Sequence, residues 1–358
     1  MFYREAGQLK SSYAGDEAIF PIVQDRWAMA VLLLFVFGVL PFIGTEYFYQ
    51  AILIPVMVYS VAAIGLNLLT GYCGQLSLGT GAFMAVGAVA CFKLATAFPE
   101  MNLIIVFVLS GLVAAGTGLL FGIPSLRIKG FYLAVATLAA QFFLSWLFNK
   151  VTWFQNYAPS GTITMPPREV FGFVITGAHA SAEARFVFCA IVVTILALAA
   201  KNIVRGPIGR SWMAIRDQDI AAELIGYRPF QTKLMAFSVS SFYVGFAGAM
   251  AFALWLGSVE TAEAFDINQS FQILFMIIIG GLGSILGSFL GAAFIVLMPI
   301  ILTNVFVGIF DMQAVTAKHI EFIVFGGLII FFLIVEPQGM ARLWQLTKEK
   351  LRSWPFPY

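Results

Sequence analysis

The segment 65–89 constrains the fold of this chain most, because it sets six glycines and several small polar residues inside sequence that is otherwise as apolar as a membrane span. Such a composition predicts a break in a helix at membrane depth. Backbone N–H and C=O groups cannot face lipid without a large cost in free energy, so the break must be buried in protein or must line a pathway. The segment therefore indicates transport across a membrane.

The composition places the chain among integral membrane proteins. Hydrophobic residues make up 61% of it and charged residues 11%, and the mean hydropathy is +0.93, whereas soluble proteins carry roughly a quarter charged residues. A net charge of +2 gives no indication of a nucleic-acid partner. The three cysteines, Cys73, Cys91 and Cys189, lie in apolar stretches without metal-ligand spacing, which is typical of packing residues.

Apolar stretches of about 20 residues predict an all-α, polytopic membrane protein with 8–10 transmembrane helices. The stretch 271–307 has 37 residues without a charge, and one helix of that length would reach roughly 55 Å at about 1.5 Å per residue. It should therefore break near 280–284 into two crossings or two partial ones. The other expected crossings are 27–45, 50–69, 82–98, 102–123, 131–148, 186–200, 234–256 and 322–335.

The distribution of charge predicts the orientation. With ten crossings, 15 of the 20 Lys and Arg residues fall on one side, which the positive-inside rule makes the cytosol. The first expected part is a cytosolic segment (1–26), which lacks the apolar core of a signal peptide. A transmembrane domain (27–335) follows, with an external loop (150–184) and a cytosolic loop (201–233). The last part is a cytosolic tail (336–358). Glu260, Glu263 and Asp266 share one external loop, either simply solvated or a docking surface.

The cytosolic loop 201–233 contains a predicted short helix within 215–226. Asp217 and Asp219 suit its amino terminus and Gly226 suits its carboxyl cap. Ile220 and Leu224 give it a small apolar face together with the two alanines between them. Such a helix could rest on the membrane surface or fit a groove in another protein.

Five motifs, in order from 64 to 340, resemble the LivM-type permease subunits of branched-chain amino-acid ABC importers. They are GLNLLTGYCGQLSLGTGAF, SLRIKGFYLAVATLAAQ, GRSWMAIRDQDIAAELIGYRPFQTKLMAFSVSSFYVGFAGAM, GGLGSILGSFLGAAF and FLIVEPQGM. The resemblance implies a permease in the bacterial inner membrane. Its implied partners are a second, LivH-type permease, two ABC ATPase subunits and a periplasmic substrate-binding protein, besides membrane lipid.

The resemblance favours branched-chain or similar amino acids as substrates. Relatives of the same architecture are also associated with urea and short amides, so these solutes remain the alternative. The chain has no GxxxxGK[ST] phosphate-binding loop. We therefore expect no cofactor on this chain, with ATP and Mg bound by the partner ATPases that carry out hydrolysis.

The resemblance also implies where the ATPases engage. In ABC importers a cytosolic coupling helix carries two alanines followed, after three residues, by a glycine. Ala221, Ala222 and Gly226 have that spacing here, although Ile220 replaces the usual glutamate and Asp219 lies one place earlier. The candidate ATPase-coupling residues are Asp217, Asp219, Ala221, Ala222, Glu223 and Gly226.

We hypothesise that the breaks at 71–81 and 280–291 meet near the translocation path. There, missing side chains let backbone approach the substrate, and half-helix ends present partial charges to a zwitterion. For the second break close helix packing is an equal alternative, because Gly287 and Gly291 form a GxxxG pair. Thr137 and Gln141 share a helix face that lines the path or bonds a neighbouring helix. The candidate path residues are Gly71, Gly74, Gln75, Ser77, Gly79, Thr137, Gln141, Gly280, Gly281 and Gly283.

Two other classes of function fit less well. A membrane enzyme needs clustered catalytic or metal-binding groups, but the two histidines, His179 and His319, fall in external segments without ligand partners, so we predict no catalytic and no metal site. A channel or ion-coupled carrier normally carries ionisable groups within its spans. Lys93 comes nearest, five residues from the end of its span and within snorkelling reach.

Overall fold

The computed structural model describes residues 23–127, 132–158, 160–170, 172–177, 180–310, 312–336 and 338–353. His179 and most of the predicted segment 1–26 lie outside these residues. The described chain is almost entirely helical, which confirms the predicted all-α membrane fold. Five short π-helical stretches (η1, η2, η3, η5, η6) extend or interrupt α-helices, and η4 is a 3-10 turn.

The first half of the described chain contains α2 (Val23–Leu34), η1 (Phe35–Val39), α3 (Leu40–Ile43), η2 (Phe48–Leu53), α4 (Ile54–Asn67), η3 (Leu68–Tyr72), α5 (Thr80–Ala97), α6 (Leu103–Ser125), α7 (Tyr132–Lys150), η4 (Thr152–Gln155) and α8 (Ala182–Arg205). The second half contains α9 (Pro207–Asp217), α10 (Asp219–Leu224), α11 (Pro229–Met250), η5 (Ala251–Leu256), α12 (Thr261–Ala264), α13 (Ile267–Gly280), α14 (Ile285–Thr303), η6 (Asn304–Ile309), α15 (Ala314–Val335) and α16 (Gly339–Ser353). Each predicted crossing coincides with one or more of these helices, although the last one, predicted as 322–335, begins earlier, at Ala314 in α15.

Eight helices in the described part of the chain are long and apolar enough to cross a membrane, and a ninth span arises if the 53° bent pair 323–335 and 339–350 counts as one. These numbers agree with the predicted 8–10 helices, and the uncharged stretch 271–307 divides into unequal parts. Helix α13 has 14 residues, which at about 1.5 Å per residue give roughly 21 Å, less than the approximately 30 Å of hydrocarbon. The glycine-rich break thus separates a short helix from a full-length one.

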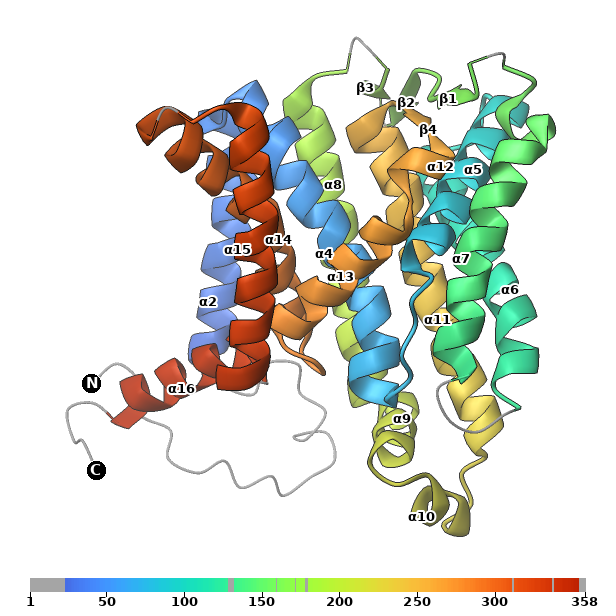
Figure 1. Ribbon diagram of the computed structural model, residues 1–358, viewed down its shortest axis with the longest axis vertical. Helices are drawn as coiled ribbons and strands as arrows, with labels where there is room; N and C mark the ends of the chain where they lie inside the picture. Colours follow the sequence, from blue (N-terminus) through green and yellow to red (C-terminus); the bar gives the residue numbers. More distant parts are fainter. Residues whose placement is uncertain are drawn as a thin grey trace.

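Different elements lie at the two ends of the bundle (Figure 1). We call the end that carries α9, α10 and α16 the lower end, and the end that carries the strands the upper end. Helix α4 descends to the lower end, and the chain then turns back upward in extended form before α5 begins (Figure 1). The chain is therefore interrupted inside the bundle, where segment 65–89 predicted a break.

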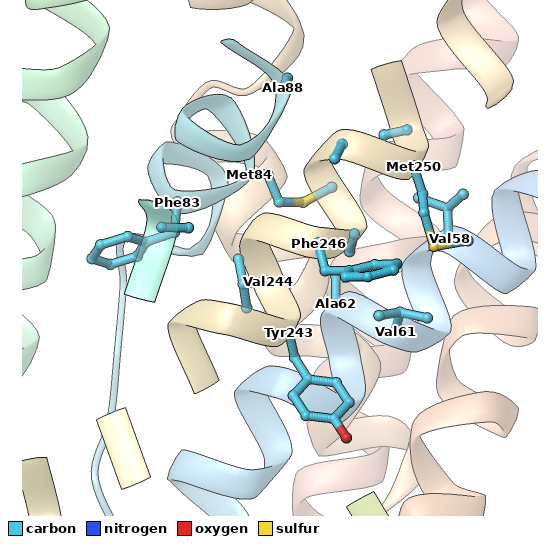
Figure 2. Close-up of a cluster of buried hydrophobic side chains, with 14 of the residues drawn as sticks. Val58, Val61, Ala62, Phe83, Met84, Ala88, Tyr243, Val244, Phe246 and Met250 are labelled. Atoms are coloured by element: carbon cyan, nitrogen blue, oxygen red, sulfur yellow. The ribbon is translucent and has the colours of Figure 1, made fainter. Parts of the chain in front are cut away.

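The core lies where α4, α5 and α11 pack together (Figure 2). Val58 and Ala62 of α4 face Phe246 and Met250 of α11, and all four side chains are buried. The α5 and α11 backbones come very close, because a Cβ added to Gly87 would lie 1.8 Å from a backbone oxygen of α11. Small residues allow this approach, as is usual between helices in membranes.

The upper end carries four short strands that the sequence did not predict. Strand β1 (Thr162–Thr164) pairs with β4 (Ser258–Glu260), and β2 (Arg168–Val170) pairs with β3 (Phe173–Thr176), both antiparallel. The Arg168 guanidinium ties this layer to α5 by donating to the carbonyls of Ala95 and Phe98, a favourable place for a cation at a helix carboxyl end.

Two charged residues singled out by the sequence have defined partners at the upper end. The Asp266 carboxylate accepts a 3.0 Å hydrogen bond from the Gln269 N–H and caps α13. Its role in the acidic external loop is therefore at least partly structural. The Lys93 ammonium lies 2.5 Å from Asn156 Oδ1 and 4.0 Å from the centre of the Trp153 ring, so it contacts the loop residues that follow α7, in line with the snorkelling interpretation.

Candidate translocation and coupling site

The first break comprises residues 71–79, that is, the end of the π-helical turn η3, where Gly71 lies, and the non-helical residues 74–79. Helix α5 then starts at Thr80 inside the protein, so its first N–H groups need partners other than water. The Gly81 N–H donates to Ser270 Oγ at 2.8 Å, and the Ala82 N–H donates to Gln141 Oε1 at 2.7 Å. The beginning of α5 is therefore capped by side chains from α7 and α13.

Thr137 and Gln141 both bond neighbouring segments, which is one of the two roles considered for them. Thr137 Oγ1 accepts a 2.9 Å hydrogen bond from the Leu78 N–H of the break. Gln141 Nε2 donates to the Phe265 carbonyl at 2.9 Å, and Ser270 Oγ donates to Gln141 Oε1 at 2.9 Å. Both α7 side chains are buried, so they fix the shape of the break from inside the bundle.

Replacing Thr137 with valine should destabilise the first break without changing side-chain volume. The Leu78 N–H would lose its acceptor at a cost of roughly 1–3 kcal/mol. Thermal unfolding of the purified protein in detergent measures this loss. Thr117→Val is the matched control, because the Thr117 hydroxyl donates to its own helix at Ala114. An equal and small effect of both substitutions would contradict the structural role of Thr137.

The second break links α13 to α14 through residues 281–284 and is organised by Asn67 of α4. Asn67 Nδ2 donates to the carbonyls of Gly281 (3.3 Å) and Ser284 (2.9 Å) and to Ser288 Oγ (3.0 Å). Its Oδ1 accepts from the Gly283 N–H at 2.8 Å. The amide is 1% exposed, so one buried side chain supplies the hydrogen bonds that the turn cannot make within a helix.

The two breaks touch each other at Gly71 and Gly283. A Cβ added to Gly71 would lie 2.3 Å from the Gly283 nitrogen and 2.0 Å from Asn67 Oδ1. No side chain fits in that space. The meeting of the breaks that the sequence hypothesis required is thus present in the structure, while their lining of a path stays a prediction.

An arginine of the coupling loop reaches this junction from the lower end. Arg216 Nη1 donates to the Gly71 carbonyl at 2.8 Å, and its Nε and Nη2 lie 2.9 Å from Asp217 Oδ1. Gly74 leaves room for the arginine, because a Cβ there would lie 2.9 Å from Arg216 Cγ and the residue has φ +71°.

A cavity of about 380 Å³ lies between the first break and the coupling loop. Gly74 and Gln75 line it on one side, and Asp217 and Asp219 line it on the other. The Lys233 ammonium pairs with Asp219 Oδ2 at 2.5 Å at its edge. Candidate path residues and candidate coupling residues therefore share one cavity.

The coupling loop folds into two short helices and not into the single predicted one. Helix α9 ends at Asp217, Gln218 is extended (φ −161°, ψ 98°), and α10 begins at Asp219. Asp217 thus closes the preceding helix instead of opening the coupling helix. The turn has an anchor on each side, since Arg216 is bound to Gly71 and Asp219 is bound to Lys233. Gly226 follows α10 with φ +99°, the conformation expected of a carboxyl cap.

The outward face of α10 differs from the one the Ala-Ala spacing suggested. Ala222 is 3% exposed, and its carbonyl accepts from the Tyr227 N–H at 3.1 Å. Leu224 is 84% exposed, and Ile220 is also exposed. Ala221 and Glu223 are exposed as well. Helix α10 therefore presents branched apolar side chains outward, while Ala222 holds the helix against its own loop.

The helix ends at the breaks are already satisfied within the protein. Ser270 and Gln141 cap α5, and the Ser284 hydroxyl accepts from the Gly287 N–H at 3.0 Å to cap α14. Whether half-helix ends also present partial charges to a zwitterion stays a prediction. Buried N–H groups must have partners, and side chains provide them here.

The remaining candidate path residues occupy different surroundings. Gly79 packs on the Thr137 carbonyl, 2.4 Å from an added Cβ, and Ser77 is buried. Gly280 faces the α14 backbone, where a Cβ would lie 2.0 Å from the Gly287 carbonyl, so this glycine serves helix packing. Gly281 lies against the start of α16, with a Cβ 2.8 Å from the Gln338 carbonyl.

Three residues of this junction were missed by the sequence analysis, namely Asn67, Arg216 and Ser270. Asn67 had a usable signal, because it is a lone amide inside an apolar span and such groups seek buried partners. Arg216 looked like one more solvated charge of a basic loop. Its contact with Gly71 spans 145 residues of chain, which local pattern cannot foresee.

Comparison with known sequences decides the family. The model of the family described as "Branched-chain amino acid transport system / permease component" matches residues 48–333. The chain belongs to this family. It is therefore a multi-pass membrane protein and a permease subunit that works together with other components of a transport system.

Two curated relatives support this assignment. The chain is similar to the "High-affinity branched-chain amino acid transport system permease protein LivM" of Salmonella typhimurium and to the protein of the same name in Escherichia coli. Each is 29% identical over 315 residues, which cover 83% of this permease and 70% of the relative. No solved structure matches the chain. The predicted LivM-type resemblance is confirmed.

Proposed function

We propose that this permease forms, with a second LivH-type permease, the translocation path of an ATP-driven importer for branched-chain or similar amino acids. The observation that carries the proposal is the contact between the two backbone breaks at Gly71 and Gly283, reached by Arg216 of the coupling loop. A conduit that a cytosolic motor opens and closes needs such a link between its gate and its coupling element.

The partners follow from the same arrangement. The apolar tip of α10, with Leu224 and Ile220 exposed, fits a groove in an ATPase subunit. The lower end is then cytosolic, in agreement with the positive-inside distribution, and the membrane is the bacterial inner membrane. ATP and Mg bind on two partner ATPases, which carry out hydrolysis, and a periplasmic binding protein delivers the substrate to the upper end.

Reconstitution of the whole transporter tests this proposal. The permease is co-produced with its second permease and ATPases, placed in proteoliposomes, and supplied with the binding protein. We expect labelled leucine, isoleucine and valine to accumulate only when ATP is present on the ATPase side. Leucine accumulation by this chain without an ATPase, or accumulation of urea or acetamide and of none of the three amino acids, would contradict the proposal.

Replacing Leu224 with glutamate should uncouple the ATPases. The change places a charge on the most exposed apolar side chain of α10, where burial against a partner is unfavourable. We expect the ATPase subunits to co-purify less and leucine uptake to fall by roughly tenfold or more, as for the central residue of an interface. The control is Ile208→Glu on α9, an exposed apolar residue away from α10. Equal effects of the two changes would refute the assigned contact.

A further inference from the structure

We propose that Arg216 is a positioning residue that transmits movement of α10 to both backbone breaks. The inference rests on the proposed function, since it concerns how an ATPase acts on this permease. It extends that function from a contact surface to the side chain through which movement reaches the gate.

Arg216 is bound to both the first break and the coupling loop. Its Nη1 donates to the Gly71 carbonyl near the end of η3, and its other nitrogens lie 2.9 Å from Asp217 Oδ1. Carbonyls near a helix end lack helical partners and bind cations favourably. The planar guanidinium thus joins a carbonyl of the first break to a carboxylate of the coupling loop in a fixed geometry.

Glycines of the two breaks flank the Arg216 side chain. Gly74 and Gly283 flank it, with an added Cβ lying 2.9 Å from Arg216 Cγ and 3.6 Å from Arg216 Nη1, respectively. Gly71 and Gly283 are themselves in contact. One arginine therefore touches the first break at two points and approaches the second, at the place where the breaks meet.

Helix α9 connects Arg216 to α10, so that movement of α10 can reach the breaks. Arg216 lies on α9, three residues before α10 begins, and the buried Trp212 and Ile215 hold α9 against the bundle. Helix α10 contacts α9 and is tied to α11 by the Asp219–Lys233 pair. A displacement of α10 by an ATPase is therefore passed to α9, and Arg216 carries it to Gly71 and onward to Gly283.

The test uses the complete reconstituted transporter with leucine as substrate. We expect the Arg216→Ala transporter to assemble and to hydrolyse ATP at a rate within twofold of that of the unmodified complex. Leucine uptake per ATP should fall roughly tenfold, a change that the loss of one hydrogen bond to a charged group can produce. Arg216→Lys keeps one donor and should recover part of the coupling. Arg210→Ala, on the same helix and exposed, is the matched control and should leave uptake per ATP unchanged.

A second readout follows the second break directly. Leu282 is 47% exposed, and the three native cysteines are buried, so Leu282→Cys can be labelled selectively with a thiol reagent. We expect ATP to change the labelling rate at least threefold, and Arg216→Ala to abolish that change. Asp217→Asn weakens the hold on the guanidinium without removing it, so it should reduce the ATP-dependent change in labelling by an intermediate amount. This variant replaces Arg216→Ala in the test if Arg216→Ala fails to assemble.

The outcomes separate the two claims. An unmodified complex that takes up leucine without ATP contradicts the proposed function. The role of Arg216 is overturned if the unmodified complex couples normally and the Arg216→Ala or Asp217→Asn variant does so too. Such a variant would keep both full leucine uptake per ATP and ATP-dependent labelling at residue 282.

Discussion

Replacing Asn67 with leucine is expected to destabilise this permease strongly, by several kcal/mol. Leucine keeps the branching at Cγ but is larger than asparagine, so every hydrogen bond of the amide is lost and the added methyl groups crowd the tightly packed turn. The buried Gly281 carbonyl and the half-buried Ser284 carbonyl and Gly283 N–H would lose their partner. At about 1–3 kcal/mol for each unsatisfied group, part of which structural relaxation recovers, we expect a loss of roughly 3–5 kcal/mol.

Thermal unfolding in detergent and co-purification with the second permease measure this effect. Ser288→Ala is the matched control, because it removes only the hydroxyl that accepts one of the Asn67 donors at 3.0 Å. It should cost about 1 kcal/mol, a typical value for one hydrogen bond. If Asn67→Leu unfolded no earlier than Ser288→Ala, the second break would not depend on Asn67.

Replacing Gly71 with alanine is expected to cause the largest loss of transport. The new methyl group would lie 2.3 Å from the Gly283 nitrogen, which belongs to the backbone and cannot move aside as a side chain can. The breaks must therefore separate, and the Arg216 bond to the Gly71 carbonyl must change with them. We expect leucine uptake by the assembled transporter to fall at least roughly tenfold, because misplacement of about 1 Å can cost a factor of a hundred in a positioned site.

The control for this change is Gly116→Ala in α6. Nothing lies within 4 Å of a Cβ at Gly116, and alanine favours an exposed helix interior by about 1 kcal/mol over glycine. The control should therefore assemble and transport normally. Normal transport by Gly71→Ala as well would mean that contact between the breaks is not needed for function.

The positions of the breaks could be predicted because they follow from composition and length. Glycines between Gly71 and Gly81 cannot continue an apolar helix at low cost, and 37 uncharged residues are too many for one crossing. The contacts that stabilise the breaks could not be predicted. Asn67 reaches Ser288 across 221 residues of chain, and such pairings arise from the tertiary fold, which no local periodicity encodes.

The coupling loop likewise combines a feature that the sequence predicts with features that depend on tertiary contacts. The carboxyl cap at Gly226 was readable, because a helix that ends at a glycine has a local cause. The turn at Gln218 was not, because it depends on Arg216 binding Gly71 and on Asp219 binding Lys233 of another helix. Burial of Ala222 likewise depends on how the loop folds back through Tyr227.

If the backbone breaks line the route of the substrate, a thiol introduced as Gln75→Cys should be shielded from labelling while the transporter works. Gln75 is half-buried and lines the cavity between the first break and the coupling loop. In the reconstituted transporter with ATP and leucine-loaded binding protein, we predict that turnover slows labelling at residue 75 at least threefold relative to leucine-free protein, whereas labelling of Leu343→Cys on α16 stays constant. A labelling rate at residue 75 that is the same with and without leucine would contradict the account.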